Sequence, residues 1–277
     1  MIDLKKEISD LQTMYKEKSA NKHFSALVIG DSGSGKTRFL ETCPRPIHID
    51  SFDPDGTITV RKGIEEGWII ADTRYEREDP TDPSAFELWD SEYERRKKGG
   101  YFENFGTYCL DSFTMFSDAV MNLVLRGLVR KADRANKSPI PTDYLKIPQE
   151  NDWPLQMTII KNAITDILTL PCNVVITGHL EDKKNKQGLV LSKGLYATGR
   201  LALRLPRLFQ EIYYLKTEET SKGIERHIIT QPDGMIEART RIGRDAFAFK
   251  EKPDMMYLLD KAGIKVEHKN YDWNKED

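Results

Sequence analysis

Cysteine is scarce in this chain, and its scarcity excludes two kinds of site. Three cysteines in 277 residues, with no ligand-like spacing, cannot form a disulfide framework or a thiolate metal site. Cys109 and Cys172 lie inside apolar runs, where we expect buried thiols, and Cys43 stands apart from both. An odd number of cysteines without pairing is typical of a reducing compartment, so we expect a cytoplasmic protein.

Long apolar runs and a dominant charge are also missing. No run approaches the roughly 18 apolar residues of a membrane span, and the first residues lack the apolar stretch of a signal peptide, so we expect no membrane partner. The formal net charge of −2 gives no overall attraction to nucleic acid, so any such binding must come from a local patch. The 39% hydrophobic content can build one large core, and strands that alternate with helical segments indicate an α/β fold.

The most informative motif that is present follows the apolar run at residues 26–29. It reads Gly30-Asp31-Ser32-Gly33-Ser34-Gly35-Lys36-Thr37, a G-x-x-x-x-G-K-T pattern between a predicted strand and a segment that can open a helix. Glycines let backbone N–H groups converge on an anion, and a helix N-terminus adds a favourable dipole. We therefore predict that these residues bind ATP, with Lys36 on the β- and γ-phosphates and Thr37 on Mg²⁺.

The predicted Mg²⁺ needs a second oxygen ligand, since this ion prefers a few carboxylates together with phosphate oxygens. Asp111 ends an apolar strand, and Ser112 follows it. The other interpretation is a strand-ending aspartate that caps the next helix. The phosphate motif upstream favours the metal role, so we predict Asp111 as the second Mg²⁺ ligand.

Two further side chains are candidates for action at the γ-phosphate. Asp53 comes shortly after a predicted strand and could position the attacking water; Asp50, Asp55 and a simple Asp-Pro-Asp-Gly turn are the alternatives. His179 follows another apolar strand and could report the state of the nucleotide to the next loop, or be structural.

Basic residues gather in two later segments. Arg239 and Arg241 would share one face of a predicted strand, and such a pair could act as an arginine finger on a neighbouring subunit's ATP, or be an ordinary exposed face. The second segment follows His179, and its cations suit a phosphodiester backbone unless they form a solvated hairpin. The predicted DNA-binding residues are Lys183, Lys184, Lys186, Lys193 and Arg200.

Hydrophobic periodicity and breaker residues divide the chain into three parts. We expect an N-terminal helical arm at 1–22, an ATPase core at 23–250, and a C-terminal helix with a loose polar tail at 251–277. The arm carries Leu4, Ile8, Leu11 and Tyr15 on one stripe, which would pack on its own core or dock on a neighbouring subunit.

Within the core, the pattern predicts alternating strands and helices, with the last two strands joined as a hairpin through Pro232-Asp233-Gly234. A polar segment with three prolines, Lys131–Asn151, is predicted as a mobile loop. The predicted strands are 24–29, 47–50, 68–70, 107–111, 173–177, 209–215, 225–230 and 234–241, and the predicted helices are 36–42, 85–98, 113–129 and 154–170.

Taken in order, these segments resemble the RecA-like core ATPases, and in particular a compact phage-encoded AAA-type family that includes single-strand annealing recombinases. The similarity runs from about Phe24 to Lys250. Gly30–Thr37 corresponds to the Walker A motif, and Tyr108–Ser112 to the Walker B strand. The resemblance implies a RecA-like P-loop NTPase fold, a mostly parallel twisted sheet flanked by helices, with an antiparallel extension from the late strands.

The resemblance also implies roles for later residues. His179 falls at the position of the family's γ-phosphate sensor, the basic segment 182–200 where RecA-like proteins place a DNA-binding loop, and Arg239 and Arg241 where recombinases carry cations that act across a subunit interface. One position departs from the pattern. RecA-like proteins have a catalytic glutamate two residues after the aspartate of the second strand, and Phe52 stands there, so Asp53 would substitute with slow hydrolysis.

Two functions from different classes follow from these features. The first is an ATP-dependent recombination or annealing protein that binds single-stranded DNA and assembles into a ring or filament with ATP between subunits. The second is a regulatory or helicase-loading ATPase whose partner is a protein of DNA replication, such as a single-strand-binding protein or a helicase. A small-molecule kinase is less favoured, because no Arg-rich lid is evident.

Overall fold

The computed structural model describes residues 3–20, 23–79, 82–126, 148–221, 223–243 and 245–269. The predicted mobile loop at Lys131–Asn151 lies outside these ranges up to residue 147, and the predicted polar tail lies outside them from residue 270. Among the described residues, no helix combines the length and apolar character that a membrane crossing requires.

A mixed sheet organises the described part of the chain. Its strand order is β3-β2-β4-β5-β1-β7-β8-β9, with β6 paired to β5 off this path. Strands from β3 to β7 run parallel, whereas β7–β8, β8–β9 and β5–β6 are antiparallel. The predicted sheet, mostly parallel with antiparallel late strands, is therefore confirmed. The strands are β1 Ser25–Gly30, β2 Ile47–Ser51, β3 Ile69–Asp72, β4 Thr107–Asp111, β5 Asn173–Lys184, β6 Val190–Leu195, β7 Glu211–Thr220, β8 Gly223–Ile229 and β9 Lys250–Glu251.

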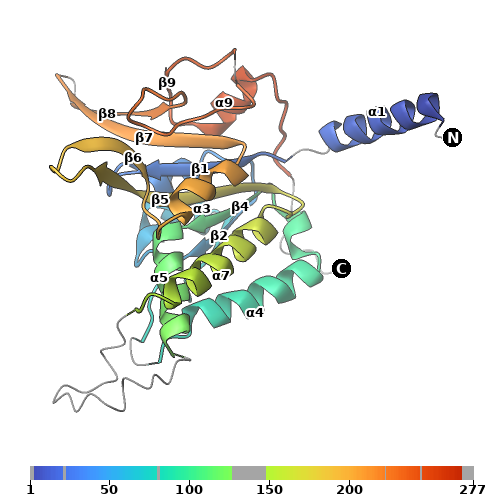
Figure 1. Cartoon of the computed structure of the whole chain (residues 1–277). Helices are drawn as coiled ribbons and strands as arrows, with labels where there is room; N and C mark the ends of the chain where they lie inside the picture. Colours follow the sequence, from blue (N-terminus) through green and yellow to red (C-terminus); the bar gives the residue numbers. More distant parts are fainter. Residues whose placement is uncertain are drawn as a thin grey trace, which may run out of the picture.

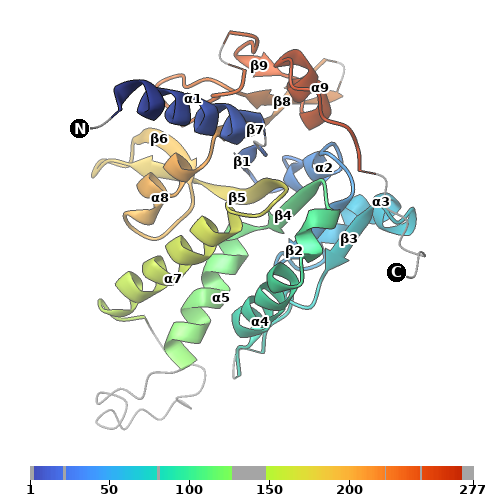
Figure 2. The same cartoon turned by 90° about the vertical axis from the view of Figure 1, so that its right-hand side faces the viewer.

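Helices cover both faces of this sheet. Helices α4, α5 and α7 lie on one face, and α2 and α9 pack on the other (Figures 1 and 2). The α-helices are α1 Leu4–Ala20, α2 Lys36–Leu40, α3 Arg61–Glu65, α4 Ala85–Lys98, α5 Phe113–Arg126, α7 Asp152–Ile167, α8 Leu201–Arg204 and α9 Met255–Lys261. Three 3₁₀ turns complete the set, η1 Gly56–Val60, η2 Tyr101–Asn104 and η4 Pro206–Leu208.

Strand β1 shows why the apolar run at its centre is continuous. Side chains alternate across a strand, so Leu27 and Ile29 enter the cluster with α4, α5 and α7, while Ala26 and Val28 enter the cluster with α2 and α9. Both clusters are closed to solvent, and a strand buried on two faces has no polar face to show. The cysteines belong to this interior: all three thiols are free and buried, and burial raises their pKa values.

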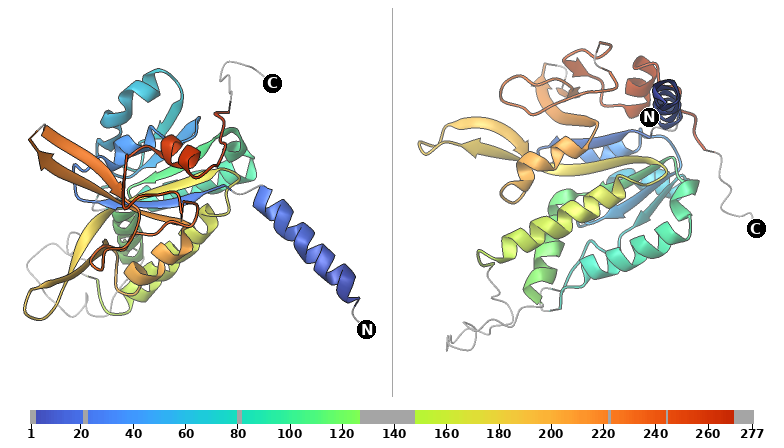
Figure 3. Two further views of the ribbon diagram at one scale, coloured as in Figure 1. Left: turned by 90° about the horizontal axis from the view of Figure 1, so that it is seen from above. Right: turned by 45° about the vertical axis from the view of Figure 1, so that its right-hand side comes forward.

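Helix α1 leads away from the sheet (Figure 3). The predicted helix is confirmed, but its apolar stripe does not reach the core of its own chain. Leu4, Ile8, Leu11 and Tyr15 are 68%, 47%, 52% and 66% exposed. Of the two interpretations of the arm, docking on a neighbouring subunit remains as a prediction.

The predicted strand over Gly234–Arg241 is wrong, and local hydrogen bonds explain why. The free edge of β8 is taken by β9, with Ile228 opposite Glu251, so no hairpin partner is needed there. The Asp233 carboxylate accepts from the backbone N–H groups of Met235 and Ile236, at 2.9 and 2.7 Å. These bonds stabilise a turn at the residues where the predicted strand would begin. The hairpin partner of β8 is β7.

Asp50, one of the alternatives for positioning water, belongs to the core. Its carboxylate accepts from the Tyr108 hydroxyl at 2.7 Å, from Trp89 Nε1 at 2.9 Å and from Arg96 Nη1 at 3.2 Å, and His48 Nε2 lies 2.9 Å away. The carboxylate is fully buried, and an anion is tolerated there only because it is paired and hydrogen-bonded. Asp50 therefore joins β2 to α4 and β4 rather than serving the nucleotide.

Replacing this carboxylate gives a test of the core. Asp50→Ala should lower the free energy of unfolding by roughly 3 kcal/mol, because it takes the buried carboxylate away from the Tyr108 hydroxyl and Trp89 Nε1 and removes one of the carboxylates that hold Arg96. Tyr108→Phe removes the hydrogen bond to Asp50 and a longer one from Trp89 Nε1 at 3.4 Å, and should cost about 1 kcal/mol. Urea titration measures both, and equal losses in the two variants would contradict a network centred on Asp50.

Candidate functional site

The glycines of the loop at 30–35 are required sterically where the loop bends. Gly33 and Gly35 have φ values of 75° and 98°, in the left-handed region that other residues avoid. Gly30 is tight for a different reason, since a Cβ on it would lie 2.7 Å from the Leu215 carbonyl oxygen of β7. Strand β1 can therefore turn sharply into α2, which begins at Lys36.

The Lys36 ammonium folds back over this loop. Its Nζ donates to the carbonyl oxygens of Gly30 and Asp31, at 3.1 and 2.9 Å. Burial lowers the pKa of Lys36, while the carboxylates of Asp111, Asp53 and Asp31 oppose that shift. A phosphate placed in the loop would offer this cation a charged acceptor, which binds more strongly than two carbonyl groups.

Asp111 connects the loop helix to the centre of the sheet. The Thr37 hydroxyl donates to Asp111 Oδ2 at 2.7 Å, and the Thr177 hydroxyl of β5 donates to Oδ1. Burial raises the pKa of Asp111, an effect that the two hydroxyl donors reduce. A hydroxyl and a carboxylate side by side form the oxygen donor set that Mg²⁺ prefers, so Thr37 and Asp111 fit the metal predicted for them.

Asp53 lies next to this pair. Its Oδ1 accepts from the Ser112 hydroxyl at 2.6 Å, and its backbone N–H donates to the Asp111 carbonyl at 3.2 Å. Asp55 lines the same cavity but is held by Arg77 at 3.2 Å, at the surface. Of the three carboxylates considered for positioning water, Asp53 alone is both tied to the Asp111–Ser112 segment and open to the cavity.

His179 reaches the loop from the neighbouring strand. In the parallel pairing of β1 with β5 it stands opposite Gly30. Burial lowers the pKa of His179, the nearby Lys36 lowers it further, and Asp53 acts in the opposite sense. The imidazole is therefore biased toward its neutral form beside the site where a phosphate would add negative charge.

These groups surround one cavity of about 420 Å³ at the carboxyl ends of the parallel strands. The phosphate loop, Asp53 and His179, which lie far apart along the sequence, all line this cavity. Sequence reasoning named Ser112 only as the end of the Walker B segment, and it missed Thr177 and Arg226, because the local sequence around these two residues indicates only a strand. The lining residues are Ser32, Gly33, Gly35, Lys36, Thr37, Arg38, Asp53, Asp55, Gly56, Thr59, His179 and Arg226.

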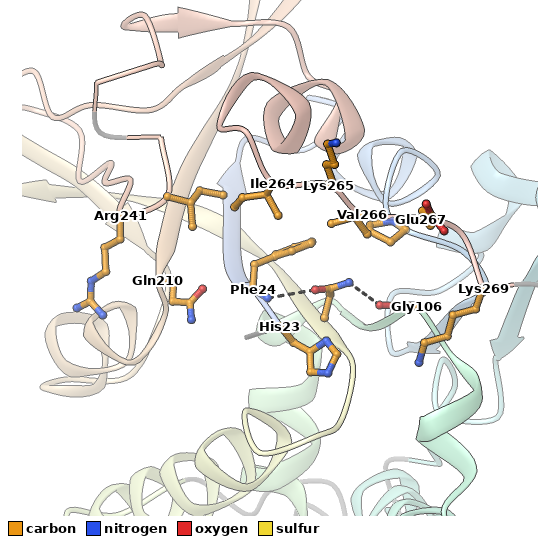
Figure 4. Close-up of a pocket in the computed structure, with 13 residues that line it drawn as sticks. His23, Phe24, Gly106, Gln210, Arg241, Ile264, Lys265, Val266, Glu267 and Lys269 are labelled. Carbon is orange, nitrogen blue, oxygen red and sulfur yellow. Dashed lines mark hydrogen bonds between the residues drawn. The ribbon is translucent and has the colours of Figure 1, made fainter. Parts of the chain in front are cut away.

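Arg239 and Arg241 do not line this cavity. The Arg239 guanidinium donates to the carbonyl oxygens of Phe209 and Pro206, at 2.6 and 3.1 Å, and so holds its own chain. Arg241 lies at a second cavity of about 620 Å³, with Phe24 and Gln210, at the amino ends of the strands (Figure 4). Since the two arginines share no strand face, the expected paired geometry is wrong; a role across a subunit interface stays a prediction.

The predicted DNA-binding cations divide into two groups. Lys183 and Lys184 end β5, Lys186 lies in the turn, and Lys193 is on β6, where its Nζ pairs with Asp182 at 3.2 Å. These four belong to one hairpin. Arg200 lies apart from it, at the start of α8, where it lines a cavity against α7.

Comparison with known proteins identifies the family. A family model described as an AAA domain matches residues 22–242. The chain belongs to this AAA domain family. Membership makes the chain a P-loop ATPase of the AAA or RecA-like kind and implies nucleotide binding, which in such domains usually involves Mg²⁺. No curated protein matches this AAA domain protein.

Among solved structures, the AAA domain protein is similar to a KaiC-like protein of the hyperthermophilic archaeon Pyrococcus horikoshii, with 14% identity, a TM-score of 0.36, and 79% of this chain covered against 82% of that one. It is also similar to the flagellar accessory protein FlaH of Methanocaldococcus jannaschii, with 10% identity, a TM-score of 0.37, and coverages of 82% and 83%.

The electrostatics of the cavity predict a titration shift. In Lys36→Met the pKa of His179 should rise toward its ordinary value of 6.5, because one of the two causes that lower it is removed. NMR titration of the His179 ring protons measures the shift, with His179→Gln to assign the resonance. His23 and His227, whose lowered pKa values owe nothing to Lys36, serve as internal controls. An unmoved His179 would place the Lys36 ammonium elsewhere.

Proposed function

We propose that this protein binds and slowly hydrolyses MgATP, and that it uses the nucleotide to control binding of single-stranded DNA in annealing or strand pairing. The family resemblance to phage-encoded annealing recombinases motivates the DNA half of this proposal. The single observation that carries it is the course of β5, which joins the nucleotide cavity to the lysine-rich hairpin without a break.

Strand β5 spans Asn173–Lys184 and has a buried half and an exposed half. The buried half pairs with β1 and β4, contributes Thr177 to Asp111, and brings His179 to the phosphate loop. Lys183 follows four residues later, so at about 3.3 Å per residue it is roughly 13 Å from His179 along one continuous strand. A change at the phosphates can thus be transmitted to the hairpin through backbone hydrogen bonds.

The same cavity supports the hydrolytic half of the proposal. Lys36 would balance phosphate charge, Thr37 and Asp111 would hold the Mg²⁺, and the Asp53 carboxylate, oriented by Ser112, would align a water. The position where RecA-like proteins carry a glutamate is Phe52, whose ring is buried and stacked on Tyr75. No carboxylate can act from that position, which is why we expect slow turnover.

Replacing the loop lysine tests the nucleotide half. Lys36→Ala should abolish measurable MgATP binding in calorimetry, because it removes the cation that faces the phosphates. Arg61→Ala, on the exposed helix α3, removes one positive charge elsewhere and should bind as the wild type does. Retention of wild-type affinity by Lys36→Ala would overturn the placement of the site.

The hairpin lysines test the DNA half. Lys183→Ala, Lys184→Ala and Lys186→Ala in one protein should weaken binding of a fluorescent oligonucleotide and flatten its salt dependence by about 2 units of log K per log salt, because each phosphate that a lysine no longer neutralises accounts for about 0.7 of the slope. A matched variant carries Lys62→Ala, Lys98→Ala and Lys252→Ala, which removes the same charge from exposed surface ion pairs. Equal behaviour of the two triple variants would remove the hairpin from the proposal.

A second candidate, a regulatory or helicase-loading ATPase, is favoured by a different feature of the same hairpin. Leu189 and Leu191 lie near its tip and are 66% and 60% exposed, where an ssDNA-binding surface would gain more from aromatic or basic side chains. Oligonucleotide binding that is weak and nearly independent of salt would support this protein-docking alternative.

Self-association is part of either proposal. The exposed stripe of α1 and the exposed Arg241 are the surfaces through which a ring or filament would form, with ATP between subunits. Sizing by light scattering with and without MgATP and oligonucleotide tests it.

A further inference from the structure

Arg226 approaches the phosphate loop from the side of β1 opposite to β5. It stands on β8, two strands away from β1, and none of the sequence motifs includes it. The place that a Cβ would occupy on Gly35 lies 3.2 Å from Arg226 Cδ and 3.4 Å from its Nε. The side chain therefore lies against the last glycine of the loop, directly before Lys36 and Thr37, and it lines the nucleotide cavity.

The register of β8 fixes this orientation. Side chains alternate along a strand, so Arg226 shares a face with Ile228, which is fully buried in the cluster that contains Phe39 and Leu40 of α2. Arg226 is the next side chain on this face toward the hairpin tip, and it lies against Gly35, directly before α2. Arg226 points at the loop because Ile228 anchors the strand against the helix that the loop opens.

No described group pairs with the guanidinium. Arg226 makes no hydrogen bond or ion pair among the described residues, and its side chain is exposed. Other arginines of this protein, such as Arg74 and Arg96, are held by carboxylates. An arginine that has no partner in the described part of the chain, rests on a phosphate loop and faces its cavity is placed to receive an anion. Its planar guanidinium matches two phosphate oxygens.

We infer that Arg226 is a phosphate-binding residue of the nucleotide site that acts within its own subunit. This inference rests on the proposed MgATP site and adds a cation that the loop motif does not contain. The phosphates would then be contacted from both sides of β1, by His179 on the neighbouring β5 and by Arg226 on β8, which lies beyond β7. The β7–β8 hairpin becomes a second element, besides β5–β6, that contacts the nucleotide; both hairpins extend from the same side of the molecule (Figure 3).

Substitution of Arg226 gives the direct test. Arg226→Ala should weaken MgATP binding in calorimetry by roughly tenfold to a hundredfold, the range for the removal of a charge-assisted hydrogen bond. Arg226→Lys keeps the charge but loses the planar guanidinium, so its affinity for MgATP should lie between those of Arg226→Ala and the wild type. Lys216→Ala is the matched control, because Lys216 stands opposite His227 on the other face of the same hairpin and should bind as the wild type does. Unchanged thermal unfolding without nucleotide shows that the variants are folded.

The outcomes separate this inference from the proposed function. Wild-type affinity in Arg226→Ala, together with loss in Lys36→Ala, overturns the role of Arg226 and leaves the nucleotide site standing. Absence of MgATP binding by the unaltered protein overturns both. Equal loss in Arg226→Ala and Lys216→Ala points to a general charge effect and overturns the specific contact.

A mixing experiment tests action within one subunit. Lys36→Ala and Arg226→Ala proteins are combined and MgATP binding is measured on the mixture. If Arg226 acts in its own subunit, every site still lacks one cation and tight binding stays absent. If tight binding returns, a subunit with an intact loop has borrowed Arg226 from its neighbour, and the assignment within one subunit is overturned.

Discussion

The rest of the site depends on the hydrogen bonds that the buried carboxylate of Asp111 accepts. It accepts from Thr37 at the start of α2 and from Thr177 within β5, and so it ties the phosphate loop to the middle of the sheet. A desolvated anion is unfavourable unless nearby donors compensate it, and here the donors are the groups a metal would displace or join. Stability without nucleotide and the proposed affinity for Mg²⁺ would thus depend on the same atoms.

Much of this arrangement can be read from the sequence, and the successful parts share a cause. The strand at Ser25–Gly30, the loop after it and the strand that ends at Asp111 are specified by local signals: buried apolar runs, glycines and strand-ending polar residues. Because parallel strands place their carboxyl ends at one edge, the loop, Asp111 and His179 could be expected to lie near one another from their order along the chain.

The parts that could not be predicted depend on contacts between distant segments. Arg226 has no local signal, because its position follows from how β8 pairs with β7 and from the burial of Ile228. The segment at 234–241 fails as a strand because β9, which follows it in the chain, takes the available edge. Asp50 and Asp53 look equivalent along the chain, yet one is enclosed by Tyr108, Trp89 and Arg96, and the other faces the cavity. The positions of these residues are determined by packing between segments that are distant in the sequence.

The enclosed thiols have a practical consequence. All three cysteines lie in the interior, and burial holds each in its protonated, unreactive form. A cysteine introduced at an exposed position, for example in place of Lys186 or Glu225, would be the only thiol that reagents in solution reach while the protein stays folded. Spectroscopic labels can therefore be attached to either hairpin of the otherwise unaltered chain, and their movement followed in real time as nucleotide is added.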